Sequence, residues 1–245
     1  MSKVLLVTGG SRGIGAATAK MANAAGYAVA INYQSDKAAA EAAAQGLKNA
    51  IIVQGDVSKP EDVARMFDET EAALGKVTHV FNSAGVTGKS SRLVDAPLEV
   101  IRQTIDINLM GAIYVSREAV KRMSTRLGGK GGVIVHVSSA AVVIGSPGEY
   151  VWYAASKGGV ESLTFGLSKE VVDEGIRVNA VVPGMVETEI HARSSGDAAR
   201  VERIRPSIPM KRIGKPEEIA SVAMFLLGDE SSYMTGATVR VSGGR

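Results

Sequence analysis

Short apolar runs rich in β-branched residues alternate along this chain with longer stretches of good helix formers, and this alternation restricts the folds open to it. The apolar runs are Val4–Val7, Ala28–Ile31, Ile51–Val53, Val77–Phe81, Val133–Val137, Ile176–Val182 and Ala237–Val241. The stretches that favour helix are 36–48, 61–74, 98–127, 154–174 and 216–227. Such alternation is typical of a parallel sheet covered by helices. We therefore expect an α/β fold with helices on both faces of the sheet.

Length and composition narrow the class of protein further. The 245 residues suit a single domain, 1–245, since no linker or repeat interrupts the pattern. No apolar run approaches the roughly 18 residues of a membrane helix, and no secretory segment precedes the first run, so we expect a cytoplasmic protein without a membrane partner. Only 4% of residues are aromatic and no nucleic-acid-binding motif occurs, which argues against a nucleic-acid partner.

Several kinds of catalytic site are also excluded. The absence of cysteine rules out disulfides, thiolate metal sites and a cysteine nucleophile. The three histidines are not spaced as metal ligands, so we expect no metal, and a Ser-His-Asp hydrolase is disfavoured.

Candidate functional residues follow the ends of most of the apolar runs. In open parallel sheets, ligands bind at the carboxyl ends of the strands, near the point where the strand order reverses. The candidates there are Gly9 to Gly15, Asn32, Asp56, Asn82, Ser139 and Pro183-Gly184. Their convergence at one edge indicates a single ligand site.

The first of these segments, Thr8 to Gly15, is a glycine-rich turn between a strand and an Ala-rich helix. Glycines in this position let the backbone approach a pyrophosphate at the helix N-terminus, although a glycine turn can also be purely structural. The segment lacks the Lys-Ser/Thr ending of a P-loop, which disfavours a nucleotide triphosphatase. We expect a dinucleotide contact from Gly9, Ser11, Arg12, Gly13, Ile14 and Gly15.

The region after the second run bears on which dinucleotide is bound. A NAD-specific site usually has an acid about 20 residues after the glycine turn, whereas Asn32 and Tyr33 follow the second run here, and we expect both to contact the cofactor. Asp36 lies further on, where an acid suits the first turn of a helix. Arg12 could pair with a 2′-phosphate through its planar fork. We predict NADP(H) as the preferred cofactor, with NAD(H) as the alternative.

A candidate catalytic pair lies at Tyr153 and Lys157. Residues four apart share one face of a helix, so the ammonium can lie beside the phenol and bring its pKa toward the working range. Tyr33 and Lys37 have the same spacing, but they follow a strand and have no serine pair before them. The pair Ser138-Ser139 precedes Tyr153, which favours Tyr153 and Lys157 as the acid–base site.

Taken together and in order, these motifs resemble the short-chain dehydrogenase/reductase family over nearly the whole length. The glycine turn resembles that family's Thr-Gly-x-x-x-Gly-Ile-Gly, Asn82 to Gly85 its Asn-Asn-Ala-Gly, and Pro183 to Thr188 its Pro-Gly-x-x-x-Thr. The resemblance implies a doubly wound, seven-stranded Rossmann fold. It also implies further cofactor contacts at Asp56, Val57, Asn82, Ala84, Gly85, Tyr153, Lys157, Pro183, Gly184, Val186 and Thr188.

The same resemblance assigns catalysis to Asn108, Ser139, Tyr153 and Lys157. It implies interconversion of a ketone and a secondary alcohol, with Ser139 and Tyr153 at the carbonyl oxygen, Lys157 at the nicotinamide ribose, and Asn108 holding a water. A buried amide that satisfies backbone groups is the alternative for Asn108. Ser139 precedes Tyr153 by 14 positions where 13 is usual, so Ser138 competes for the serine role. Strand alternation lets only one of them face the site, and we favour Ser139.

The substrate is less well defined by the sequence. The family's variable lid corresponds to about 189–213, and Glu149 to Trp152 are candidates for one wall of the pocket. Relatives that resemble this chain include 3-oxoacyl-carrier-protein reductases and glucose or ketone dehydrogenases. Glu174 stands where carrier-binding members tend to be basic, which counts against the first. A dinucleotide sensor without catalytic activity is the alternative from another class. The family is usually tetrameric, so we expect a homotetramer.

Overall fold

The computed structural model describes residues 3–188 and 200–245, and a seven-stranded sheet runs through them. Its strands are β1 (Val4–Thr8), β2 (Ala28–Tyr33), β3 (Ala50–Gln54), β4 (His79–Asn82), β5 (Gly132–Val137), β6 (Ile176–Pro183) and β7 (Thr238–Val241). All neighbours pair in parallel, in the order β3-β2-β1-β4-β5-β6-β7. The predicted doubly wound Rossmann sheet of seven parallel strands is confirmed.

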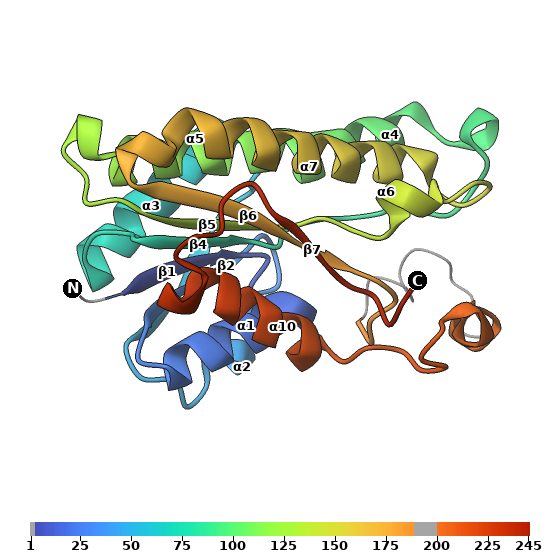
Figure 1. Cartoon of the computed structure of the whole chain (residues 1–245), viewed down its shortest axis with the longest axis horizontal. Helices are drawn as coiled ribbons and strands as arrows, with labels where there is room; N and C mark the ends of the chain where they lie inside the picture. The colour runs from blue at the N-terminus through green and yellow to red at the C-terminus, as the bar shows by residue number, and fades with distance from the viewer. Residues whose placement is uncertain (1–2, 189–199) are drawn as a thin grey trace.

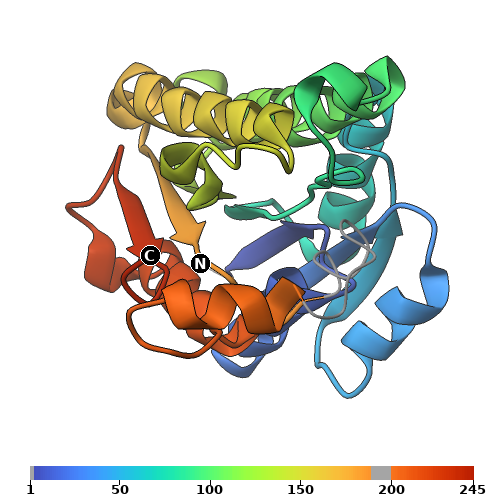
Figure 2. The ribbon, with the colours of Figure 1, turned by 90° about the vertical axis from the view of Figure 1, so that its right-hand side faces the viewer.

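Helices cover the sheet on both faces. They are α1 (Gly13–Ala24), α2 (Lys37–Ala44), α3 (Pro60–Leu74), α4 (Leu98–Ile105), α5 (Gly111–Met123), α6 (Ala141–Ile144), α7 (Val151–Val171), α9 (Arg200–Ile204) and α10 (Pro216–Leu227). Figure 1 shows α3, α4, α5 and α7 above the sheet and α1, α2 and α10 below it. Figure 2 shows the same arrangement from the end of the sheet, with the strands between two helical layers.

Alternation along the strands builds a hydrophobic core on each face. In β1, Val4 and Leu6 pack with Phe67 of α3, whereas Leu5 and Val7 pack on the opposite face with Ile219 of α10. All of these side chains are almost fully buried. Successive strand residues point to opposite faces, so a strand covered on both sides must be apolar throughout. This explains why the strands appear in the sequence as continuous apolar runs.

One predicted helix contains a π turn. The stretch 98–127 forms α4, a π-helical turn at Asp106–Met110, α5, and a short 3-10 turn at Thr125–Leu127. The π turn places Asn108 between the two α-helical parts, and such turns are frequent at functional sites. The predicted helix therefore forms from Leu98 to Met123 and ends at Ser124, before the predicted bound.

The predicted lid is only partly described. Residues 189–199 lie outside the described residues, whereas 200–213 contain α9 and a 3-10 turn at Arg205–Ser207. The two ends of the segment meet at the Val186–Gly214 bridge, where Glu187 N donates to Gly214 O at 2.9 Å. This bridge anchors the segment beside the end of β6.

The strand order reverses between β1 and its neighbours β2 and β4. The chain runs outward from β1 through β2 to β3, then crosses back to β4 on the other side of β1. The carboxyl ends of β1 and β4 therefore flank the crevice where doubly wound proteins bind their ligands.

Candidate active site

A cleft of about 590 Å³ opens at the carboxyl ends of the strands. Most of the predicted site residues line it: Gly9, Ser11, Arg12, Gly13, Ile14, Ala84, Gly85, Ser139, Tyr153, Lys157, Pro183, Gly184, Val186 and Thr188. The structure thus brings together segments that the sequence separates by more than 170 residues. The predicted residues Gly15, Asn32, Tyr33, Asp56, Val57, Asn82 and Asn108 are not among those that line it.

The glycine turn forms one end of the cleft and depends on close backbone packing. A Cβ added to Gly15 would lie 2.3 Å from Gly9 O, and one added to Gly9 would lie 2.8 Å from Ala84 Cα. Gly9 and Gly13 have φ of 61° and 51°, in the region that favours glycine. Arg12 precedes the first turn of α1 without capping it by its side chain, so backbone N–H groups remain for an anion. The turn therefore fits a pyrophosphate.

The opposite wall of this end comes from β6. A Cβ on Gly13 would lie 3.0 Å from Thr188 Cγ2, so Thr188 packs against the glycine turn. Val186 is buried beside it. The predicted cofactor residues of the Pro-Gly segment therefore face the predicted dinucleotide turn across the cleft.

Arg12 and Asp36 form an ion pair at the ends of β1 and β2. Asp36 is also the N-cap of α2, and its Oδ1 accepts from Ala39 N at 2.9 Å. The interpretation of Asp36 as a residue of the helix start is confirmed. The same ion pair holds the Arg12 guanidinium at the edge of the cleft.

Asn32 supports the turn from behind. Its side chain is buried, its Oδ1 accepts from Gly9 N at 3.2 Å, and its Nδ2 donates to Gly55 O at 3.0 Å. The side chain of Asp56 is also hydrogen-bonded within the protein, since its Oδ1 accepts from Ser58 Oγ at 2.7 Å. The side chains of both residues thus join loops at the ends of β1, β2 and β3.

A buried hydrogen-bonded chain crosses the sheet beneath the cleft. Thr8 Oγ1 donates to Asn82 Oδ1 at 2.6 Å and accepts from the backbone N–H groups of Ser83 and Ala84, both at 3.2 Å. Asn82 Nδ2 donates to His136 Nδ1 at 3.3 Å, which leaves the proton of His136 on Nε2 toward Ser116 Oγ, also at 3.3 Å. The chain fixes the strand end that carries the Ser83-Ala84 backbone.

This chain predicts a pH dependence of stability. Burial lowers the pKa of His136 from 6.5 to about 4. Between about pH 6.5 and 4 the unfolded chain therefore binds a proton that the folded chain does not bind. The free energy of unfolding falls as the pH drops through this range. The His136 contribution between pH 7 and 5 amounts to about 2 kcal/mol.

Urea unfolding at pH 7 and pH 5 measures this loss in the native protein and in His136→Asn. Burial lowers the pKa of His79 to about 4 as well, so the variant should keep the part of the loss that His79 causes. An equal loss in both proteins would show that His136 is not the titrating group.

The other end of the cleft carries Ser139, Tyr153 and Lys157. Ser139 follows β5, and Tyr153 and Lys157 lie one turn apart on α7. The Ser139 hydroxyl hydrogen-bonds the Tyr153 phenol. Ser138 is turned away, since its Oγ donates to Glu161 Oε1 at 2.7 Å. Of the two serines, Ser139 is therefore the one beside the tyrosine, and the two side chains point apart as strand alternation predicted.

The expected effect of Lys157 on the phenol is not found. Burial raises the pKa of Tyr153 to about 12, against the smaller opposite effect of Ser139, and lowers the pKa of Lys157 to about 8. Lys157 Nζ lies 5.9 Å from the centroid of the Tyr153 ring and donates to Val137 O at 2.7 Å. The cost of burying each charge outweighs their attraction at this separation.

Asn108 lies directly behind this pair. Its Oδ1 accepts from Val86 N and its Nδ2 donates to Val86 O, both at 2.8 Å. A Cβ added to Gly85 would lie 3.2 Å from Asn108 Oδ1 and 3.3 Å from Lys157 Nζ. Asn108 thus satisfies backbone groups, as in the alternative considered above, while it fixes the loop that lies against the Lys157 ammonium.

Sequence reasoning found only Ala84 and Gly85 of the loop after β4, which forms a third side of the cleft. The lining residues not predicted are Ser83, Val86, Thr87, Gly88, Lys89, Val100, Gln103 and Val137, and Ser138, the alternative to Ser139, also reaches the lining. Trp152 holds this loop, because its Nε1 donates to Thr87 O at 2.9 Å. Its place immediately before Tyr153 was the one available signal.

Among residues 3–188 and 200–245, no group of three His, Cys, Asp or Glu side chains is placed to hold a metal ion. In that same part of the chain, the helices are too short or too polar to span a bilayer.

Comparison with known proteins identifies the family. A family model described as "Enoyl-(Acyl carrier protein) reductase" matches residues 9–245. The chain is 44% identical over 246 residues to "Uncharacterized oxidoreductase YgfF" of Escherichia coli, covering 99% of each chain. It is 38% identical over 248 residues to "3beta-hydroxysteroid dehydrogenase 1" of Eggerthella lenta, covering 99% of this chain and 93% of the relative.

A solved structure agrees with these relatives. A short-chain dehydrogenase from Burkholderia cenocepacia, in complex with NADP, superposes with a TM-score of 0.91 at 32% identity, covering 99% of this chain and 97% of that one. The fold and site define an oxidoreductase that uses a nicotinamide dinucleotide. The chain belongs to the short-chain dehydrogenase/reductase family.

Proposed function

We propose that this protein interconverts a ketone and a secondary alcohol with NADP(H), and that Tyr153 is the general acid and base. The observation that carries the proposal is one continuous cleft with a dinucleotide turn at one end and the Ser139, Tyr153 and Lys157 side chains at the other. The relative described as a 3β-hydroxysteroid dehydrogenase supports chemistry at a CH–OH group.

The side chains divide the work of carbonyl reduction. Bound at the glycine turn, NADPH supplies the hydride that the carbonyl carbon receives. Negative charge then develops on the carbonyl oxygen, where Ser139 donates a hydrogen bond and Tyr153 donates the proton. With a pKa of about 12, Tyr153 is protonated at neutral pH and holds the form that reduction requires. We assign Lys157 to the nicotinamide ribose, and in the oxidation direction each transfer reverses.

A substrate panel tests the proposed reaction. NADPH consumption is followed with small ketones and with acetoacetyl thioesters, and NADP⁺ reduction with secondary alcohols and glucose. We expect turnover of at least one ketone and of the matching alcohol. Tight NADPH binding without turnover of any compound would favour the dinucleotide sensor instead.

The preference for NADP(H) is proposed from Arg12. Its guanidinium lies at the cleft beside the end of β2 and pairs with Asp36. A 2′-phosphate bound there would be a second anionic partner for the guanidinium. The NADP-bound structure of a family member supports the same choice.

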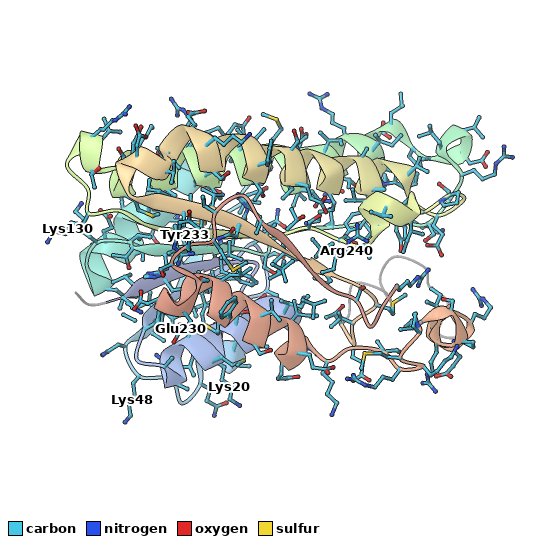
Figure 3. All side chains as sticks on the ribbon, in the orientation of Figure 1. Lys20, Lys48, Lys130, Glu230, Tyr233 and Arg240 are labelled. Carbon is cyan, nitrogen blue, oxygen red and sulfur yellow. The ribbon has the colours of Figure 1, made fainter. Side chains whose placement is uncertain are left out.

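Arg12→Ala should therefore weaken NADPH binding about 10-fold or more relative to NADH. Fluorescence titration with both cofactors measures the ratio, and Lys20→Ala serves as the control on the exposed face of α1 (Figure 3). An unchanged ratio in Arg12→Ala would remove the argument for NADP(H).

An acyl-carrier substrate is less well supported. Arg126 and Lys130 are the basic residues that would meet an acidic carrier. Arg126 pairs with Asp173 and lies 3.6 Å from Glu174 Oε1, so two acids offset its charge. Assembly as a homotetramer remains part of the proposal, and the exposed apolar side chains Phe165 and Val172 at the end of α7 are consistent with it.

A further inference from the structure

A second cavity of about 210 Å³ adjoins the cleft at its catalytic end. The two share Ser139, Tyr150 and Gly184 in their linings. Beyond these residues the smaller cavity is lined by apolar side chains of Ile144, Met185 and Ile204, and by polar side chains of Ser146, Glu149 and Arg245. The proposed hydride transfer uses none of these six.

Arg245 is held in place by its own backbone. Its N–H donates to Ser242 O at 3.3 Å, and its carbonyl accepts from Ser242 Oγ at 2.7 Å. Ser242 in turn packs on the β6 end, since a Cβ on Gly184 would lie 2.8 Å from Ser242 Cα. Gly243 O accepts from Met210 N at 3.1 Å. The segment after β7 is thus fixed between the Pro183-Gly184 turn and the chain that follows α9.

The Arg245 guanidinium is available to a ligand. Its residue is only partly exposed, and no ion pair joins it to Glu149 or to any other acid within residues 3–188 and 200–245. A guanidinium at the wall of a small cavity offers a planar fork that matches a carboxylate.

Ser146 supplies a second, independent indication. The residue is 7% exposed, it lines the cavity, and its hydroxyl makes no hydrogen bond to the residues that the structure describes. Its φ of 49° is unusual for a residue with a side chain. The hydroxyl is therefore free to donate a hydrogen bond to a ligand acceptor in the cavity.

We infer that this cavity is a subsite for the carboxylate of the substrate, bound by the Arg245 guanidinium and the Ser146 hydroxyl. The inference rests on the proposed function, because it places the carbonyl of the same molecule at Ser139 and Tyr153. With Glu149 in the same wall, the lining carries one acid and one base and no net charge, so it disfavours a phosphate dianion more than a monoanion. The substrate class is therefore an oxo acid, reduced to the corresponding hydroxy acid.

Binding to the NADP⁺-loaded protein tests the subsite without turnover. The probes are 4-oxopentanoate and 5-oxohexanoate, each against its methyl ester, measured by isothermal titration calorimetry. We expect at least one acid to bind about 10- to 100-fold more tightly than its ester, and Arg245→Met to abolish that difference. Ser146→Ala should reduce it in part. Arg240→Met, on the exposed face of β7 (Figure 3), should leave it unchanged.

Equal binding of acid and ester, or a preference that survives Arg245→Met, overturns the inference. NADPH oxidation with the same four compounds separates its failure from that of the proposed function. Turnover of the esters without any advantage for the acids removes the carboxylate subsite alone. Acid binding that depends on Arg245, without any turnover, keeps the subsite and removes the proposed reaction.

Discussion

Tyr153→Phe should lower kcat for ketone reduction by about 10²- to 10⁴-fold, while NADPH binding stays within a few-fold of the native value. The substitution removes only the hydroxyl that hydrogen-bonds Ser139 and donates the proton. The ring itself remains in its edge-on contact with Tyr150, 5.4 Å between centroids, so the fold should persist. Steady-state assays of NADPH consumption measure kcat, and a fluorescence titration measures the affinity for NADPH.

Tyr233→Phe is the matched control, because this fully exposed tyrosine lies far along the chain from the cleft segments (Figure 3). It should keep the native rate. A Tyr153→Phe protein that reduces the substrate as fast as this control would contradict the role assigned to the phenol.

Gly15→Ala should weaken NADPH binding about 100-fold or abolish it. The new Cβ would lie 2.3 Å from Gly9 O and 3.0 Å from Gly10 Cα, and both are backbone atoms that cannot rotate away. The glycine turn must then move off the N-terminus of α1, where the pyrophosphate is expected. Equilibrium titration with NADPH, alongside a thermal unfolding curve, separates lost binding from lost folding.

Gly166→Ala provides the comparison within a helix. A Cβ at this position of α7 meets nothing within 4 Å, so binding should be unchanged and the helix slightly stabilised. Native affinity in folded Gly15→Ala would mean that the turn does not hold the dinucleotide.

The fold could be predicted because its local and global requirements coincide. The central strands are buried on both faces, so β1 and β5 appear in the sequence as unbroken apolar runs. That only one of Ser138 and Ser139 faces the tyrosine followed from the same alternation of side chains. The apolar runs and the opposite directions of the two serines depend only on the spacing of residues within one strand. That spacing can be read from the sequence alone.

Features that depend on contacts between elements could not be predicted. The π turn at Asp106–Met110 places Asn108 against the Val86 backbone, a contact over 22 residues. Asn32 turns inward because Gly9 N and Gly55 O require a partner there. The pKa of Tyr153 moved against expectation, since burial depends on the packed structure and not on the spacing to Lys157. The cavity at Arg245 needs four separate segments to form.

Transfer of isotope from cofactor to substrate tests the central claim most directly. The protein is supplied with NADPH deuterated at the nicotinamide C4, separately on each face, and with a ketone from the panel that it consumes. We predict that deuterium from one of the two faces appears on the carbinol carbon of the alcohol, as seen by mass spectrometry and NMR. Alcohol formed without deuterium from either cofactor, or no alcohol from any ketone tested, would contradict the account.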